Sequence, residues 1–86
     1  MNRHPAPWQF VLDLLEAHAP MPGETDEARA RYRYLDAGHI DSFGLIHFIM
    51  DIETEYGITL EPEDTQSDEF RTVGGLAGII ARKIGA

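Results

Sequence analysis

The feature that most constrains the fold is the segment from Ser42 to Tyr56, where apolar residues recur at helical spacing. At about 100° per residue, one face of a helix over this segment collects a set of large apolar side chains: Leu45, Phe48, Ile49, Ile52 and Tyr56. Gly57 follows directly, and glycine very commonly ends a helix. The segment therefore predicts a long amphipathic helix with one face in a hydrophobic core, which favours an all-α fold.

The same helix carries a second apolar stripe, made of Phe43, Ile46 and Met50. One stripe is enough to attach a helix to a core. The second stripe is therefore either additional core or an exposed patch of the kind that binds partners. We predict that Phe43 and Met50 are exposed, and we leave Ile46 between the two alternatives.

Two more helices are expected, one near each end of the chain. The first has apolar residues at positions i, i+3, i+4 and i+7: Trp8, Val11, Leu12 and Leu15. It should end near His18, because Pro20 cannot continue a helix. The last helix begins after Thr72, a preferred cap, and its apolar residues also follow the helical period: Val73, Leu76, Ile79, Ile80 and Ile84.

A long connection, residues 19–40, joins the first helix to the central one. Within it, Thr25 is a suitable cap for a short helix over residues 26–31. Four apolar side chains are expected to fix the connection to the core: Tyr32, Tyr34, Leu35 and Ile40. Unstructured connections of this length inside small domains are uncommon and are often functional.

A shorter connection joins the central helix to the last one. We predict an acidic turn at Glu61–Asp64, then a short third helix within Thr65–Phe70 that Ser67 caps. The whole chain is then a single domain spanning residues 1–86, with residues 1–7 as a loose lead-in. Its fold class is all-α, a small four-helix bundle with one long connection, between helices one and two, and a short third helix.

Charge and composition exclude several classes of function. The chain has no cysteine, which removes disulfides and thiolate metal sites. Its net charge is −8 at pH 7, which argues against nucleic-acid binding through a basic surface. Between Arg33 and Arg71 there are ten acidic residues and no lysine or arginine. This stretch favours basic protein partners or simply keeps a small protein in solution, and composition does not decide between the two.

The cellular setting is inferred from what the hydropathy pattern lacks. The first residues contain no apolar signal core, and no apolar run approaches the length that spans a bilayer. We therefore expect a soluble, cytoplasmic protein that does not insert into membranes. A monomer is expected as well.

Asp41 and Ser42 stand where the central helix begins, and both are preferred N-cap residues. The third helical position is then Gly44 or Leu45, so the capping box that would support a purely structural role is absent. A hydroxyl at a helix N-terminus also lies where free N–H groups and the helix dipole stabilise a phosphate. The pair therefore marks either a cap or a phosphorylated or phosphopantetheinylated serine.

Catalytic and metal sites are weaker interpretations of the same region. His39, Asp41 and His47 lie near Ser42 in the sequence, but the Gly-x-Ser-x-Gly elbow of serine hydrolases is absent. The histidines also lack the His-x-x-x-His spacing of a helical zinc site. The Glu61–Asp64 turn lacks the glycine and ligand spacing of a calcium loop. We predict neither catalysis nor a metal site.

The sequence closely resembles the acyl carrier proteins over roughly residues 34–84. Three groups of residues carry the resemblance, together with the apolar helix between the first two: Asp41-Ser42-Phe43, Glu53-x-Glu55-Tyr56-Gly57-Ile58 and Thr72-Val73. The Asp-Ser pair alone is a weak signal, but the combination is specific. The first helix fits that of the family in position and pattern, so the resemblance implies a four-helix bundle of acyl-carrier type.

The resemblance implies a site and a set of partners. A holo-acyl-carrier-protein synthase would attach 4′-phosphopantetheine to Ser42, with Asp41 helping this Mg²⁺-dependent enzyme to engage the serine. The thiol of the arm would carry an acyl or aminoacyl group as a thioester, and the carrier itself would do no chemistry. Several residues of the central helix would contact the partner enzymes: Phe43, Ile46, His47, Met50 and Glu53.

Within the family, Asp41-Ser42-x-Gly44 and Glu69-Phe70-x-Thr72 look most like the D-alanyl and related aminoacyl carriers. Fatty-acid carriers usually have acids where this chain has Gly44 and His47. We therefore predict a carrier between an acyl- or aminoacyl-adenylating ligase and a downstream acyltransferase of a specialised pathway. The alternatives are a carrier of fatty-acid or polyketide synthesis, and an acidic helical interaction module without a prosthetic group.

Overall fold

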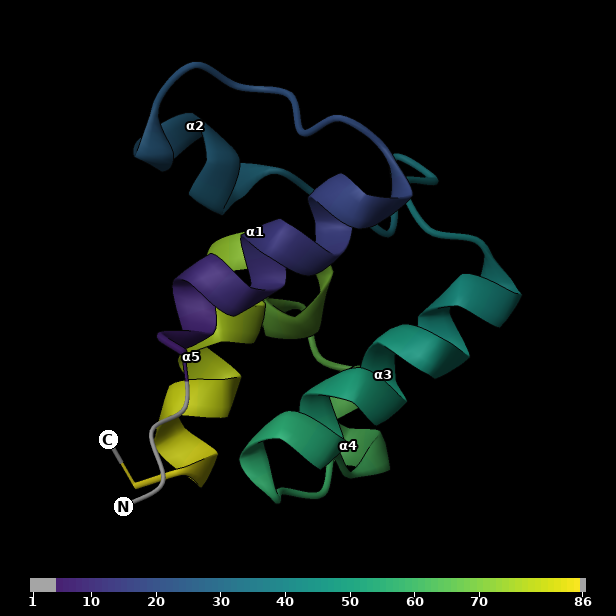
Figure 1. Ribbon diagram of the computed structural model, residues 1–86, viewed down its shortest axis with the longest axis vertical. Coiled ribbons are helices and arrows are strands. Elements are labelled where there is room, and N and C mark those ends of the chain that lie inside the picture. The colour runs from purple at the N-terminus through teal and green to yellow at the C-terminus, as the bar shows by residue number, and fades with distance from the viewer. Residues whose placement is uncertain (1–4, 86) are drawn as a thin grey trace.

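The computed structural model describes residues 5–85, and the regular elements among them are all helical, which confirms the predicted fold class (Figure 1). In chain order they are α1 (Pro7–His18), α2 (Asp26–Arg31), α3 (Ser42–Tyr56), α4 (Pro62–Thr65), the 3₁₀ helix η1 (Glu69–Arg71) and α5 (Val73–Lys83). No helix in the described part of the chain is long and apolar enough to cross a membrane.

The ends of the predicted helices follow from local capping. Thr25 accepts a hydrogen bond from the N–H of Ala28 at 3.1 Å and starts α2. Thr72 accepts one from the N–H of Gly75 at 3.1 Å and starts α5. Gly57 ends α3 with a φ of 64°, in the left-handed region that glycine adopts without steric cost. These starts and stops are confirmed as predicted.

The segment between α3 and α5 differs from the prediction. The predicted acidic turn is itself a helical turn, α4, because Pro62 favours a first helical position and Asp64 accepts a hydrogen bond from the N–H of Glu61 at 2.9 Å. The short third helix predicted within residues 65–70 is present as η1, which begins at Glu69 and ends one residue later than predicted, at Arg71. Ser67 accepts a hydrogen bond from the N–H of Phe70 at 3.3 Å, which is the predicted capping contact, although Asp68 is the residue that directly precedes η1.

The lead-in is shorter than predicted. Residues 1–4 lie outside the described part of the chain, and Pro7 already belongs to α1. The Tyr56 hydroxyl donates a hydrogen bond to the Pro5 carbonyl at 2.6 Å, which ties the start of the chain to the last residue of α3. Pro7 therefore belongs to a helix and not to the lead-in, and the flexibility of the lead-in stays a prediction.

The centre of the core is aromatic. The Tyr34 ring packs against Phe48 of α3 and Phe70 of η1, with ring centroids 5.7 and 6.3 Å apart, and all three side chains are buried. The Tyr34 hydroxyl donates a hydrogen bond to the Phe70 carbonyl. Burial raises the pKa of the Tyr34 phenol, so the group remains a donor. As predicted, Tyr34 and Ile40 fix the long connection to the core, whereas Tyr32 and Leu35 are half-buried.

The glycines of α5 have a packing reason. A Cβ at Gly75 would lie 2.1 Å from the Glu69 carbonyl oxygen, and one at Gly74 would lie 3.1 Å from the Ala30 Cβ. Only glycine at position 75 allows η1 to approach α5 this closely, and a side chain at position 74 would push α2 slightly away. The α5 helix packs against α1, α2 and η1, and this packing offsets the low helix propensity of its glycines.

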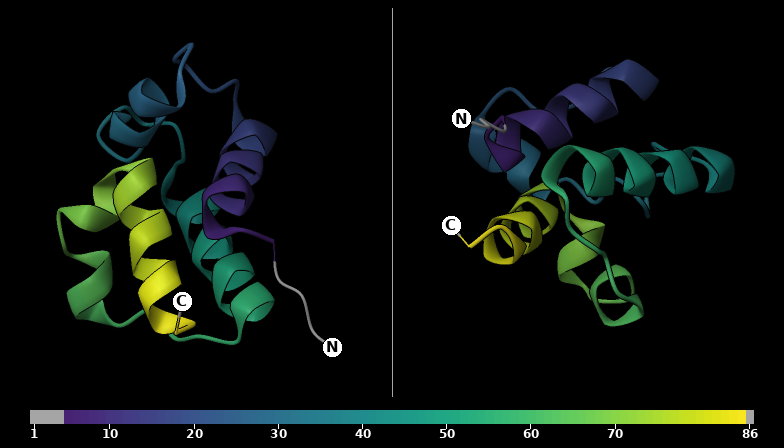
Figure 2. Two further views of the ribbon diagram at one scale, coloured as in Figure 1. Left: turned by 90° about the vertical axis from the view of Figure 1, so that its left-hand side faces the viewer. Right: turned by 60° about the horizontal axis from the view of Figure 1, so that its bottom comes forward.

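The long connection places two helix ends together. In both Figure 1 and the right-hand view of Figure 2, the C-terminal end of α1 and the N-terminal end of α3 lie on the same side of the molecule. The start of α3 therefore adjoins α1 and the connection between α1 and α2.

Candidate functional site at the start of helix α3

Asp41 is the N-cap of α3. Its backbone is extended, with φ −83° and ψ 179°, and its Oδ1 accepts a hydrogen bond from the N–H of Gly44 at 2.6 Å. Ser42 is the first residue inside the helix. Of the two candidate caps in the sequence, the aspartate therefore does the capping and the serine does not.

Ser42 is exposed, and no other residue in the described part of the chain makes a hydrogen bond to its hydroxyl. It stands beside the unpaired N–H groups of the first turn of α3, where the helix dipole favours negative charge. A hydroxyl in this position is accessible to a partner enzyme, and a phosphate attached to it lies in a favourable field.

His39, three residues before Ser42, is fully engaged. Its Nε2 lies 2.9 Å from the Leu15 carbonyl oxygen and 3.0 Å from that of Ala19, and its Nδ1 lies 2.9 Å from the Tyr32 hydroxyl. Two carbonyl acceptors require the hydrogen on Nε2, so Nδ1 of the neutral ring accepts from Tyr32. His39 thus links the segment before Ser42 to the end of α1 by hydrogen bonds. The sequence pattern suggests His39 only as a catalytic or metal-binding candidate and gives no sign of these contacts.

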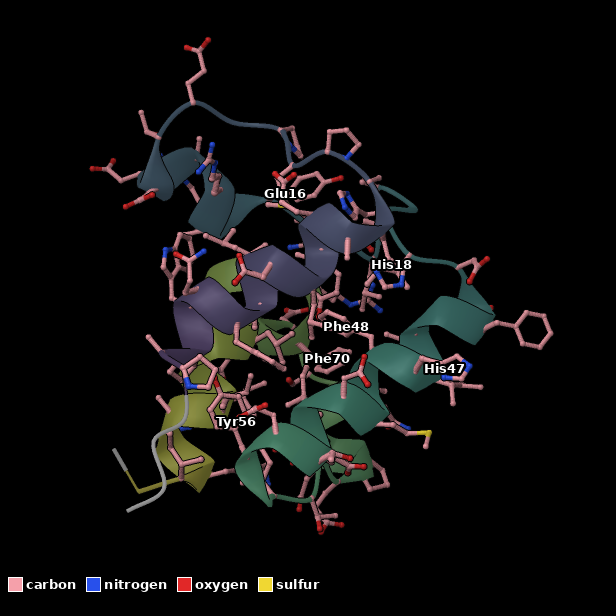
Figure 3. The ribbon with its side chains drawn as sticks, in the orientation of Figure 1. Glu16, His18, His47, Phe48, Tyr56 and Phe70 are labelled. Atoms are coloured by element: carbon pink, nitrogen blue, oxygen red, sulfur yellow. The ribbon has the colours of Figure 1, made fainter. Side chains whose placement is uncertain are left out.

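The other polar candidates do not gather around Ser42. His47 is exposed on α3, one turn into the helix (Figure 3). The described residues contain no group of three or more histidine, aspartate or glutamate side chains arranged to hold a metal ion. A cavity of about 310 Å³ lies at the connection between α1 and α2, and its lining does not include Ser42: Pro22, Gly23, Ala28, Arg31 and Tyr32.

An apolar strip, formed by Phe43, Ile46 and Met50, lies on α3 beside the serine. These side chains are 80%, 57% and 54% exposed, and they are the large hydrophobic side chains that the described part of the chain leaves most open to solvent. The predicted exposure of Phe43 and Met50 is confirmed, and Ile46 belongs with them. The predicted core face of α3 is also confirmed, with Phe48, Ile52 and Tyr56 buried and Leu45 and Ile49 half-buried at its edge.

Two residues have structural roles that the sequence pattern does not reveal. The Glu53 carboxylate accepts a hydrogen bond from the N–H of Leu60 at 2.8 Å, which holds the chain reversal after α3. A Cβ at Gly44 would lie 2.9 Å from Ile40 Cγ2 and 3.0 Å from Asp41 Oδ1. Close packing in the first turn of α3 therefore requires glycine at position 44. A role of Glu53 in partner binding stays a prediction.

A small helical domain that presents a free serine hydroxyl and an apolar strip at the start of one long helix has the build of a carrier or interaction domain. The chain is 31% identical over 77 residues to an acyl carrier protein from an Exiguobacterium species, which covers 88% of this chain and 95% of that protein. The chain belongs to the acyl carrier protein family. No family model matches the chain, and no solved structure matches it.

Proposed function

We propose that this protein carries an acyl or aminoacyl group as a thioester on a 4′-phosphopantetheine arm attached to Ser42. Family membership supports a carrier role, and acyl carrier proteins generally carry this arm. One observation carries the assignment to Ser42: the hydroxyl is exposed and unengaged because Asp41 supplies the cap of α3. When bound, the arm supplies a thiol that holds the cargo.

The residues at the start of α3 have separate tasks in the attachment. In the transfer, Ser42 Oγ forms a bond to the phosphorus that carries the pantetheine, the pyrophosphate bond of coenzyme A breaks, and adenosine 3′,5′-bisphosphate leaves. The serine proton passes to a base of the synthase. Asp41 uses Oδ1 to cap α3, and its second oxygen is available to the Mg²⁺-dependent holo-acyl-carrier-protein synthase.

The apolar strip and the acids of α3 are the proposed surface for that synthase, for an adenylating ligase and for a downstream acyltransferase. Several acids elsewhere already have cationic partners, since Asp36 pairs with Arg33 and Arg71, and Asp64 pairs with Lys83. Those pairs do not involve the exposed Asp51 of α3, whose negative charge can attract basic surfaces. Within α3, the exposed Asp51 follows Met50 directly.

The packing of the interior favours a small cargo that stays outside the bundle over a long acyl chain that would enter it. The centre of the bundle is occupied by the rings of Tyr34, Phe48 and Phe70, which pack against one another at an angle and are all buried. A long chain would have to displace these rings, whereas an aminoacyl group remains outside. Together with the Gly44 and His47 pattern, this favours an adenylating ligase that loads an amino acid. Loading assays with a panel of amino acids and fatty acids test this choice directly.

Coexpression with a promiscuous holo-synthase, followed by intact-mass measurement, tests the attachment. Ser67 is the other serine of the chain and provides a matched control, because its hydroxyl donates to the Asp64 carbonyl at 2.6 Å and is engaged. Wild type and Ser67→Ala should gain the phosphopantetheine mass, and Ser42→Ala should not. If wild type gains no mass, or Ser42→Ala gains it equally, the proposal is wrong.

The partner surface is tested by Met50→Glu, with Thr59→Glu as a control of equal charge change outside the helices. We expect the Met50 variant to be loaded about tenfold more slowly by its ligase, because a charge in the middle of an apolar contact must be desolvated. The circular-dichroism signal should be unchanged, since Met50 is 54% exposed. If Met50→Glu instead lost thermal stability and circular-dichroism signal as strongly as it lost loading, Met50 would belong to the core.

A further inference from the structure

The three residues that precede Ser42 are each fixed to a different part of the molecule. His39 is bonded to carbonyls at the end of α1. Ile40 is buried in the core, and Asp41 is bonded to the first turn of α3. Only the first of these attachments links the start of α3 to α1 by hydrogen bonds. Removing it would loosen the segment, and with it the cap at Gly44, without removing the side chains that make the cap and the core contact.

The attachment at His39 is specific in geometry. The turn before it is set by Gly38, whose φ of 70° lies in the left-handed region, and the N–H of His39 donates to the Tyr34 carbonyl at 3.0 Å. The imidazole then occupies the end of α1, where it contacts the carbonyl of Ala19, the residue after the helix, and that of Leu15, which also accepts the N–H of Ala19. Tyr32 holds the opposite nitrogen, and its ring meets the imidazole edge-on with centroids 5.5 Å apart.

We propose that His39 is a positioning residue for the modification of Ser42: by fastening residues 39–41 to α1 and Tyr32, it fixes where the serine hydroxyl stands relative to the apolar strip. This inference rests on the proposed function. A partner enzyme that docks on the strip finds the hydroxyl at a set place, and displacement of a reacting group by about 1 Å can cost up to 100-fold in rate. His39 acts through Ser42 and does not itself touch the reacting atoms.

Three variants remove different numbers of the hydrogen bonds that attach His39. His39→Ala removes the three side-chain hydrogen bonds. His39→Gln keeps a donor near the position of Nε2 and loses the acceptor at Nδ1, and Tyr32→Phe removes only the bond to Nδ1. Tyr56→Phe is the control, because it removes a hydrogen bond at the opposite end of α3. If His39→Ala does not fold, Tyr32→Phe still weakens the attachment of His39 and can be measured in its place.

The first measurement is the rate of phosphopantetheine transfer by a holo-synthase to the purified apo protein. We expect His39→Ala to lower kcat about tenfold with KM nearly unchanged, because the apolar strip still docks. His39→Gln and Tyr32→Phe should lose about two- to threefold, and Tyr56→Phe should match wild type. A merely structural role would not lower kcat at a temperature where all variants remain folded.

The second measurement is amide hydrogen exchange in the unmodified protein, which does not depend on transfer. The Gly44 amide, held by Asp41, should exchange about tenfold faster in His39→Ala and be unaffected by Tyr56→Phe. Unchanged Gly44 exchange, or wild-type kcat in the folded variants, would overturn the positioning role. Absence of any transfer to wild type would refute the proposed function instead, and exchange would still decide the role of His39.

Discussion

Asp41 is predicted to have two separable roles, and two substitutions distinguish them. Asparagine keeps a side-chain oxygen that can accept the hydrogen bond from Gly44, whereas alanine cannot. Loss of an N-cap costs about 1 kcal/mol, within a range of about 0.5 to 2. Loss of the negative charge at the helix N-terminus costs about 0.3 to 1 kcal/mol. We therefore expect Asp41→Asn to lose at most about 1 kcal/mol, and Asp41→Ala to lose about 1 to 3 kcal/mol.

Attachment of the arm should respond differently from stability. If the carboxylate also engages the Mg²⁺-dependent synthase, both substitutions remove one charge-assisted contact, worth about 1.5 to 3 kcal/mol. That corresponds to a loss of about 10- to 150-fold in kcat/KM for phosphopantetheine transfer. Asp41→Asn should thus be nearly as stable as wild type and yet be modified slowly.

Urea unfolding followed by circular dichroism measures the first effect, and the initial rate of mass gain measures the second. Transfer to Asp41→Asn at the wild-type rate would refute the second role and leave Asp41 as a cap alone. Equal destabilisation by asparagine and alanine would refute the assignment of the cap to a hydrogen bond, because only alanine removes the acceptor for Gly44. The two outcomes are independent.

Two further predictions concern the fold that supports the site. Tyr34→Phe keeps the ring but leaves the buried Phe70 carbonyl without its donor, so thermal unfolding should show a loss of about 1 to 3 kcal/mol; a loss below about 0.5 kcal/mol would contradict the hydrogen bond. The hydrogen bond from Lys83 lowers the pKa of Asp64 below its ordinary value of 3.8. This pair stabilises the fold by at most about 1 kcal/mol, because its side chains are partly solvated. The stabilisation is fully present above pH 3.8, the ordinary pKa of the carboxyl, and is lost as the pH falls through the lowered pKa of the folded state. Asp64→Asn should therefore differ from wild type in urea unfolding at neutral pH and converge with it in acid, and a constant difference would refute the assignment.

The predictable part of the fold is the part set by local signals. Thr25 and Thr72 cap helices through hydrogen bonds that reach only three residues along the chain, and Gly57 ends one through its own φ. The acidic turn predicted at Glu61–Asp64 is instead the helical turn α4, because Pro62 favours a first helical position. The cap at Ser67 is again a local signal, since its hydrogen bond reaches only to Phe70.

The parts that the sequence could not predict depend on contacts between distant residues. His39 bonds to the Leu15 carbonyl at the end of another helix, and nothing in its own neighbourhood indicates this. The glycines of α5 read as weak helix formers until the position of Glu69 shows why Gly75 cannot carry a side chain. Glu53 reads as a surface acid, although its carboxylate holds the N–H of Leu60.

The order of Asp41 and Ser42 decides which of the two side chains caps α3 and which is exposed at the proposed attachment site. The sequence alone does not reveal this. An N-cap side chain turns back over the helix end to accept an N–H, whereas the side chain of the next residue does not. A serine at position 41 would have its hydroxyl engaged by Gly44, as Asp41 Oδ1 is now. At position 42 the hydroxyl is exposed and still lies beside the unpaired N–H groups. Two residues with almost equal capping preference are therefore not interchangeable, because the acid caps the helix and leaves the serine hydroxyl exposed.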